Sequence, residues 1–402
     1  MQVYAQDKNK GAVFGIGSDA GSRITINKNN SAVNANVHWD KSYKANLGID
    51  FNVLNSRLAV TFEAYREWNR EMLMNIAQTI PTTVGTQSAA TNLGKMDSWG
   101  YELSLTWRDK IGKDFKYRIG LNTGYSDNRV LNMDWEKDYI YRQITHGHRT
   151  DIGVWGMQCI GMFRSFQDIE EYFDKYKITS YMGLSKDQVR PGMLIYKDVR
   201  GALQPDGTYA GPDGIVDASN DQVRISNRSN NIYGFTVNLG ADYKGISLTA
   251  QLSASWGGYT TVPSAALKPT GNLEYCNMPS FWNPDNMYAY EDIKDAAGNI
   301  VVSENRNGYL PNLAYSSVNS VASTFWQISN TRVTLNRLTL AYTIPSALVK
   351  KIGIQSARVN VTGQNLINFY NPYPDHFTSP MAGTYGSYPN LRKFTVGVNL
   401  SF

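Results

Sequence analysis

The sequence is poor in cysteine, in long apolar runs and in charge. Its only cysteines among 402 residues are Cys159 and Cys276. This scarcity excludes a zinc module or a disulfide scaffold, although one bridge between two loops is left open. No run of about eighteen apolar residues is present, so no membrane-spanning helix is predicted, whereas a barrel of half-apolar strands needs none. The net charge of +5 is spread along the chain and predicts no nucleic-acid partner.

The motifs of catalysis are missing as well. The sequence contains no nucleophile elbow, phosphate-binding loop or dinucleotide fingerprint. The four histidines include the pair His146 and His148, but no third ligand follows at metal-binding spacing. We therefore expect a protein that is not an enzyme and whose histidines bind no metal.

A secretory leader is also absent from the start of the sequence. The first twenty residues have no apolar core segment and no small-residue cleavage site. We expect either a processed chain or a piece of a larger protein.

The last twelve residues show the clearest pattern in the sequence. Side chains of a strand alternate between its two faces, so residues of one parity share a face. The apolar parity consists of Phe394, Val396, Val398, Leu400 and Phe402, and the residues between them are mostly polar. An outer-membrane barrel strand has this pattern over about 9–11 residues.

The same alternation recurs in four hairpins, which predicts nine strands with the last one included. The third hairpin has a short turn at Lys244-Gly245, and the turn of the fourth contains a helical piece at 348–351. Nine is an odd number and would leave bare edges, so we expect the carboxy-terminal part of a larger barrel. The strands are predicted near 43–51, 58–68, 101–107, 117–122, 235–243, 246–256, 325–342, 357–366 and 391–402.

The connections are long on one side of the predicted sheet and short on the other. This asymmetry is typical of outer-membrane barrels, whose long loops face the outside of the cell. Aromatic residues near both strand ends, such as Trp107 and Trp256, fit two membrane-interface girdles. The predicted fold is thus all-β, an antiparallel transmembrane β-barrel, with a soluble antiparallel sandwich as the alternative. The long connections are 70–96, 127–231, 260–320 and 368–390, of which 127–231 and 260–320 are the main extracellular loops.

Several passages together resemble the carboxy-terminal barrel of SusC/RagA-family TonB-dependent outer-membrane transporters. The resemblance covers nearly all of residues 1–402. It departs from the family in lacking a plug, an energy-coupling box and the amino-terminal strands. The passages are Trp39–Lys44 leading into Asn46–Phe51, Asn92–Met96 before Gly100–Leu103, Pro191–Met193 with Tyr196–Val199, Tyr233–Phe235, Leu335–Tyr342, Val361–Leu366 and Tyr388–Pro389.

The resemblance implies a barrel of 22 strands closed around a plug in the cell outer membrane. The complete protein would import oligosaccharides or peptides, lidded by a SusD-like surface lipoprotein and driven by TonB through the plug. The five apolar residues ending at Phe402 would be the signal that the barrel-insertion machinery reads. Import of another nutrient such as a siderophore, or a binding or adhesion barrel without transport, are the alternatives.

A loop rich in aspartate is the one candidate metal site. Carboxylates separated by glycine can surround calcium with oxygen ligands, but the spacing does not match an EF-hand, and a solvated turn is the alternative. Calcium is therefore the one cofactor left open. The candidate ligands are Asp198, Asp213, Asp217 and Asp221.

Aromatic residues gather in the last two long connections. Such rings, with neighbouring Asn and Asp, could stack on sugar rings and bind their hydroxyls. The alternative is that they pack against other loops or against the partner lipoprotein. The candidate ligand-binding residues are Trp282, Tyr288, Tyr290, Phe369, Tyr370 and Tyr373.

Overall fold

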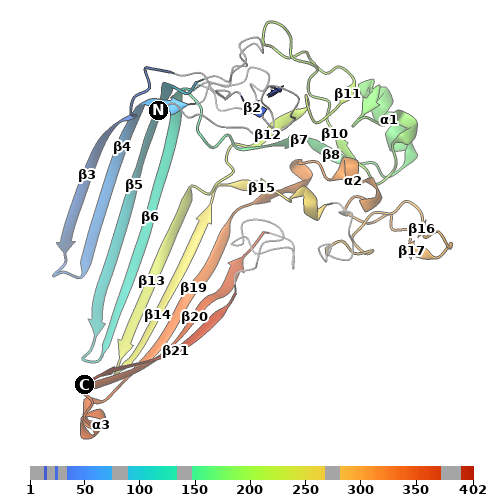
Figure 1. Cartoon of the computed structure of the whole chain (residues 1–402). Helices are drawn as coiled ribbons and strands as arrows, with labels where there is room; N and C mark the ends of the chain where they lie inside the picture. The colour runs from blue at the N-terminus through green and yellow to red at the C-terminus, as the bar shows by residue number, and fades with distance from the viewer. Residues whose placement is uncertain are drawn as a thin grey trace. The chain divides into compact units, whose positions relative to one another are not determined.

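The dominant element of the computed structural model is an antiparallel sheet of nine strands (Figure 1). Their order in space is β21-β20-β19-β14-β13-β6-β5-β4-β3, so each long strand lies beside the next long strand of the chain. This up-and-down order is the one that a barrel wall requires. The described residues are 13–15, 23–25, 34–74, 89–133, 147–267, 281–372 and 391–402.

All nine predicted strands are confirmed, with some changes in length. The strand predicted at 101–107 begins ten residues earlier, at Thr91. The sequence did not indicate this part of the strand, because the segment before Gly100 lacks strict alternation. The strand predicted from 325 begins at Arg332, since Phe325 and Trp326 lie in a 3-10 turn. The strands are β3 (Lys41–Val53), β4 (Leu58–Met74), β5 (Thr91–Ile111), β6 (Phe115–Asn132), β13 (Tyr233–Tyr243), β14 (Ile246–Trp256), β19 (Arg332–Ile344), β20 (Ser356–Tyr370) and β21 (Lys393–Ser401).

The short turns are built by residues with left-handed backbone. Lys244 and Gly245, at φ 46° and 88°, close β13 and β14 in the manner of a two-residue hairpin turn that matches strand twist. A Cβ at Gly245 would lie 2.9 Å from the Thr343 carbonyl oxygen, so glycine is required there. The turn between β19 and β20 contains α3 (Ser346–Val349), which confirms the predicted helical piece.

The chain divides into two compact units. The first contains β1 (Val13–Gly15) and β2 (Arg23–Thr25), which form an antiparallel pair. The first unit comprises Met1–Asn46, Tyr65–Trp99 and Asp127–Thr150, and the second comprises Leu47–Ala64, Gly100–Ser126 and Asp151–Phe402.

Within the second unit, the connections between sheet strands contain secondary structure of their own. The predicted loops 127–231 and 260–320 are therefore folded segments over their described residues, and 127–132 belongs to β6. The elements are β7 (Val154–Met157), β8 (Cys159–Met162), α1 (Phe166–Tyr176), β9 (Ser180–Tyr181), β10 (Leu194–Tyr196), β11 (Ile215–Val216), β12 (Gln222–Ser226), β15 (Tyr259–Thr261), β16 (Ile293–Lys294), β17 (Ile300–Val302), α2 (Ser316–Asn319) and β18 (Gln327–Ser329), with 3-10 turns at Lys186–Gln188, Ser264–Ala266, Leu313–Tyr315, Thr324–Trp326 and Lys350–Ile352.

These connecting segments share a hydrophobic core, and we call them the loop domain (151–232, 257–267 and 281–329). Helix α1 starts at a capping box in which Ser165 and Asp168 satisfy each other's backbone amides. Its buried face contributes Tyr172, whose hydroxyl donates to the Tyr196 carbonyl at 2.6 Å. Tyr181 is fully buried, donates to the Leu194 carbonyl and accepts from the Tyr196 amide at 2.9 Å.

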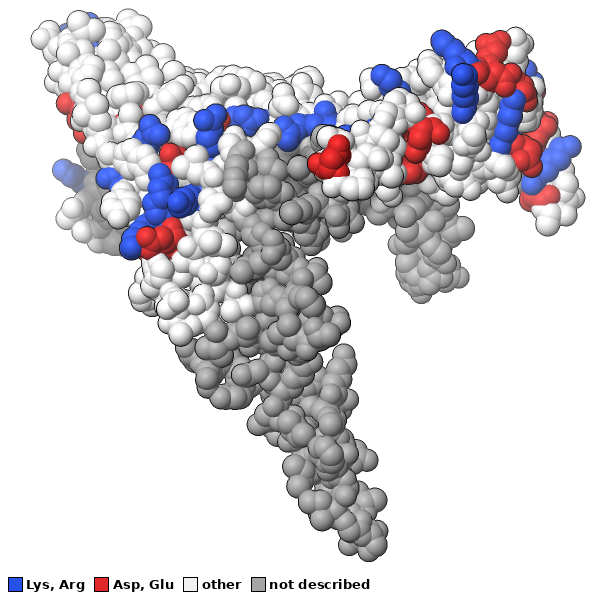
Figure 2. Space-filling view, turned by 90° about the horizontal axis from the view of Figure 1, so that it is seen from above, with Lys and Arg blue, Asp and Glu red and all other residues white. Residues whose placement is uncertain are grey.

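The charged surface of the loop domain is mixed in sign. Lys186 lies between Glu170 and Asp174 beside α1, and it forms ion pairs with both. At the right of the view in Figure 2, acidic (red) and basic (blue) side chains are interspersed. Exposed ion pairs of this kind contribute little to stability, so the loop domain is stabilised mainly by its buried core.

No helix in the described part of the chain is both long and apolar enough to cross a membrane.

Removing one buried hydroxyl should loosen the loop domain. Tyr181→Phe leaves the Leu194 carbonyl and the Tyr196 amide without their partner, and we expect a local destabilisation of about 1–3 kcal/mol. Hydrogen exchange at Tyr196 in the complete receptor measures the loss of protection. Tyr176→Phe, at a side chain that is 45% exposed, is the matched control. Equal protection in both variants would show that the buried hydroxyl does not hold this core.

Candidate functional site

One face of the nine-stranded sheet is apolar and exposed. Phe394 and Val396 on β21 are each 70% exposed, and Leu47 on β3 is 61% exposed. A continuous apolar face of this extent is typical of a surface that meets lipid or another protein. The five residues predicted as the assembly signal all lie on this face or at its end, with exposed side chains. That the barrel-insertion machinery recognises these residues stays a prediction.

A row of aromatic rings crosses five neighbouring strands of the second unit. Tyr101 packs on Phe62 and on Tyr125, with ring centroids 6.4 Å and 6.1 Å apart. Tyr233 continues the row, stacking on Tyr125 at 5.8 Å and on Trp256 at 6.1 Å. Tyr233 and Trp256 lie at the long-loop ends of β13 and β14, where an aromatic girdle was predicted, whereas Phe62 and Tyr101 lie farther down β4 and β5.

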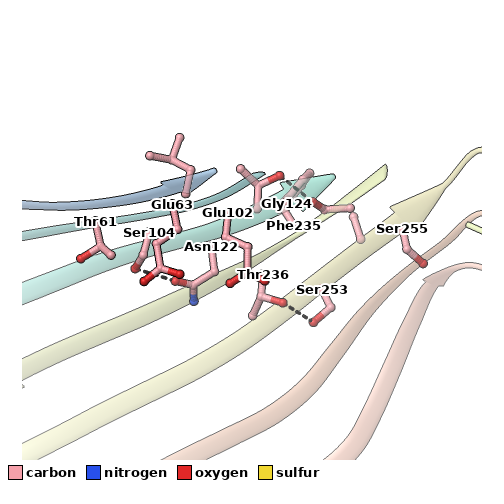
Figure 3. Close-up of a pocket in the computed structure, with 14 residues that line it drawn as sticks. Thr61, Glu63, Glu102, Ser104, Asn122, Gly124, Phe235, Thr236, Ser253 and Ser255 are labelled. Atoms are coloured by element: carbon pink, nitrogen blue, oxygen red, sulfur yellow. Dashed lines mark hydrogen bonds between the residues drawn. The ribbon is translucent and has the colours of Figure 1, made fainter. Parts of the chain in front are cut away.

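The opposite face of the same strands is polar and hollowed. The hollow has a volume of about 650 Å³ and lies on β4, β5, β6, β13 and β14 (Figure 3). We call it the upper hollow. It is lined by Thr61, Glu63, Glu102, Leu103, Ser104, Asn122, Thr123, Gly124, Gly234, Phe235, Thr236, Ser253, Ala254 and Ser255.

Cross-strand hydrogen bonds fix the polar side chains of the upper hollow. Ser104 donates to the Asn122 side-chain oxygen at 2.8 Å, and Thr236 and Ser253 are 3.2 Å apart (Figure 3). Asn336 on β19 donates to Ser253 at 2.6 Å. Each hydroxyl or amide has further hydrogen-bonding capacity, so the wall can bind a polar molecule and remain ordered.

Two carboxylates face this hollow without an ion pair among the described residues. Glu63 and Glu102 come from β4 and β5, and both are labelled around the hollow in Figure 3. A carboxylate is a strong hydrogen-bond acceptor with about four lone-pair sites. The upper hollow is therefore suited to hydroxyl and amide donors of a polar ligand.

Three of the predicted ligand-binding aromatics lie in the loop domain, and their contacts are mainly internal. Tyr288 is fully buried and its hydroxyl donates to the Arg164 carbonyl. Trp282 is half-buried and donates to the Ala266 carbonyl at 2.8 Å. The Tyr290 ring lies 4.3 Å from the Arg306 guanidinium carbon. These contacts favour the packing alternative, and ligand binding by these residues stays a prediction.

The other three predicted aromatics fall partly outside the described residues. Phe369 and Tyr370 are exposed and lie at the end of β20. These two residues fall in the predicted connection 368–390. The loop assignment was wrong at these two positions, because β20 remains paired with β19 as far as Tyr370. Tyr373 lies outside the described residues.

A different pair of aromatics borders a cavity in the loop domain. Tyr309, 57% exposed, and Phe325 line a cavity of about 250 Å³ together with Phe281, Trp326 and Pro372. The sequence offered no signal that these aromatic rings would meet, because they come from segments up to 45 residues apart.

Each aspartate of the predicted calcium loop accepts at least one backbone amide, and Asp198 Oδ1 is buried without a hydrogen-bond partner in the residues that the structure describes. Asp221 is buried, and it accepts from the amides of Val199 at 2.7 Å and Asp217 at 2.9 Å. Asp198 accepts from Gly214 at 2.8 Å, and burial raises its pKa. Among the described residues no three acidic, histidine or cysteine side chains group as a metal site. Calcium binding by Asp198, Asp213, Asp217 and Asp221 stays a prediction.

The cysteine and histidine predictions are only partly within the described residues. Cys159 is half-buried and its thiol lies 3.2 Å from the Gly161 carbonyl oxygen. Cys276 and His146 lie outside the described residues, so the proposed disulfide stays a prediction. His148 accepts a backbone bond from Val130 at 2.7 Å.

One carboxylate anchors the loop domain close to the start of β13. Asp151 accepts from the amides of Ser229 at 3.0 Å, Asn230 at 3.1 Å and Gly153 at 2.9 Å. Burial alone would raise the pKa of Asp151, but the hydrogen bonds from Ser229, Asn230 and Gly153 outweigh it and lower the pKa.

The Asp151 anchor should weaken in acid. Since its pKa is lowered on folding, the stabilisation is complete above the ordinary Asp pKa of about 3.9 and is lost as pH falls through the lowered value. Hydrogen-exchange protection at Ser229 and Asn230 should follow this course, and Asp151→Asn should remove the pH dependence. Protection that is already lost well above the ordinary pKa would contradict the assignment.

Comparisons with known proteins agree with this arrangement. The family model described as TonB dependent receptor-like, beta-barrel, matches residues 11–153. TonB-dependent receptor P3 of Formosa agariphila is 25% identical over 395 residues, covering 92% of this chain and 35% of that protein. TonB-dependent receptor SusC of Bacteroides thetaiotaomicron is 25% identical over 126 residues, 30% of this chain and 12% of SusC.

A solved structure shares the fold along the whole chain. The structure of the RagAB peptide transporter matches with a TM-score of 0.66 and 18% identity, covering 98% of this chain and 38% of that chain. The chain thus spans little more than a third of the proteins that it matches along most of its length. These relatives are named receptors or transporters, in agreement with the prediction that the chain is not an enzyme. By sequence and by fold, the chain is therefore similar to part of the outer-membrane β-barrel of TonB-dependent receptors, SusC and the RagAB transporter among them.

Proposed function

We propose that the complete receptor imports oligosaccharides or peptides across the outer membrane, and that this chain supplies part of the wall along which they pass. The upper hollow carries the proposal. Its hydroxyl, amide and carboxylate groups lie on the face of the sheet opposite the exposed apolar face. A polar cargo needs such partners to replace its lost water.

The size and openness of the polar surface support a cargo of more than one sugar or amino acid. The upper hollow of about 650 Å³ extends over five strands, and polar pairs such as Asn238 and Gln251, 3.1 Å apart, continue the wall beyond it. The similar RagAB structure is that of a peptide transporter by its title, which supports peptides as one cargo class.

We further propose that the long-loop end faces the outside and is covered by a SusD-like surface lipoprotein. The loop domain has its own buried core and presents exposed rings such as Phe166, Tyr176 and Tyr309. A folded, partly aromatic surface is better suited to docking a rigid partner than a set of mobile loops would be. Energy from TonB, delivered through a plug, completes the scheme that the family implies.

Replacing the two carboxylates of the upper hollow should impair uptake. Glu63→Gln combined with Glu102→Gln, in the complete receptor, replaces charge-assisted hydrogen bonds that contribute about 1.5–3 kcal/mol each. We expect the cargo concentration at half-maximal uptake to rise about tenfold or more, while receptor abundance in the membrane is unchanged. Growth on candidate oligosaccharides and peptides as sole carbon source, followed by uptake of the labelled cargo, measures the effect.

Asp114→Asn is the matched control, because Asp114 lies in the β5–β6 turn away from the upper hollow. Loss of uptake in both variants would point to impaired assembly. Full uptake in the Glu63 and Glu102 variant would reject the upper hollow as a cargo surface. Absence of any uptake by the unaltered receptor would favour the binding or adhesion alternative.

A further inference from the structure

A second hollow lies on the polar face nearer the short turns, and its charge is opposite to that of the first. It has a volume of about 580 Å³ and is formed by β5, β6, β13, β14 and the turn before β4. We call it the lower hollow. Its cationic side chains are Arg57, Arg108, Lys110, Lys116 and Arg118.

Strand register explains why these cations meet. Arg118 on β6 lies opposite Gly240 on β13, which in turn lies opposite Thr249 on β14. A Cβ at Gly240 would be 3.8 Å from Arg118 Nε, so the Arg118 side chain extends over the space that this glycine leaves. The Arg108 amide donates to the Arg57 carbonyl at 2.8 Å, which brings a second and a third arginine into the same region.

The hollow holds more positive charge than its own carboxylates balance. It is lined by five cationic side chains and two carboxylates, a surplus of three positive charges. Asp109 pairs with Arg57 at 3.4 Å, and Asp242 accepts from Ser247 at 2.5 Å. Within the described part of the chain, Arg108, Lys110, Lys116 and Arg118 form no ion pair. Like charges that share a site destabilise each other unless an anion joins them.

An alternative interpretation is that these cationic side chains are simply solvated by water near the short turns and bind no ligand. That reading does not account for the gathering of three guanidinium groups and two ammonium groups around one hollow of ligand size. Guanidinium groups bind carboxylate, sulfate and phosphate with two parallel hydrogen bonds, and their field is strengthened in a recess with low-dielectric walls.

We propose that the lower hollow binds oxyanions, and that the imported cargo carries carboxylate, sulfate or phosphate groups. This inference rests on the proposed import function and narrows its cargo class. From Ser104 to Arg108 along β5 the distance is four residues, about 13 Å at about 3.3 Å per residue. One oligosaccharide or peptide can therefore present donors to the carboxylates of the upper hollow and an anionic group to the arginines below.

The test is titration of the complete receptor with inorganic pyrophosphate and, separately, inorganic sulfate, followed by calorimetry at low and moderate salt. We expect saturable binding that weakens with salt, as charge pairing near a surface does. Arg108→Gln combined with Arg118→Gln should weaken pyrophosphate binding by about tenfold or more, the effect of losing charge-assisted hydrogen bonds. Arg337→Gln, on β19 outside the lower hollow, is the matched control and should bind as the unaltered receptor does.

Absence of binding to the unaltered receptor overturns the proposal, and so does equal weakening by the control variant. If pyrophosphate does not bind and Arg108→Gln with Arg118→Gln lowers the melting temperature, the hollow is filled by an acidic segment of the receptor itself, and the ligand assignment is wrong. Uptake of a neutral cargo without pyrophosphate binding would reject this inference and leave import standing. Pyrophosphate binding in a receptor that takes up nothing would reject import and the assignment of the cargo, and would leave oxyanion binding by the lower hollow standing.

Discussion

The alternation of side chains across a hydrogen-bonded sheet is the constraint on which this structure depends. Strands inside a membrane must pair all their backbone groups with one another, because lipid offers no partners. The nine strands pair in a continuous antiparallel order, in which only β3 and β21 have a neighbour on one side alone. Once the backbone is paired, period-two alternation leaves one face of the sheet apolar and the other polar. Both the aromatic row and the two hollows follow from that division.

The two hollows make the charge of the polar face differ along the strands, from negative in the upper hollow to positive in the lower hollow. Carboxylates from Glu63 and Glu102 lie at one level, and the arginines led by Arg108 and Arg118 lie nearer the short turns. A cargo moving along this wall would meet acceptors first and cations later if the long-loop end faces outward. Charge order of this kind can favour one cargo class and a direction of binding without any moving part in the wall itself.

Local pattern was enough to predict the strands, because a strand of Val, Leu and Phe alternating with Thr, Ser and Asn carries its own signal. It was not enough for the early part of β5, where residues such as Asn92 and Gly94 are held by pairing rather than by alternation. The loop domain shows the same limit. Tyr288 was expected to face a ligand, but its burial depends on Arg164, 124 residues away in the chain. The lower hollow depends on strand register between β6 and β13, which no short sequence motif encodes.

The central claim is that β14 presents one face to lipid and the other to water, and single cysteines can test it. In the complete receptor with Cys159 and Cys276 replaced by serine, cysteines are placed one at a time from Leu248 to Ser253 and exposed to a water-soluble maleimide in intact outer membranes. The positions of Thr249, Gln251 and Ser253 should react, and those of Leu248, Ala250 and Leu252 should not. Uniform reactivity along the strand, or the opposite alternation, would contradict a barrel wall with a polar cargo face.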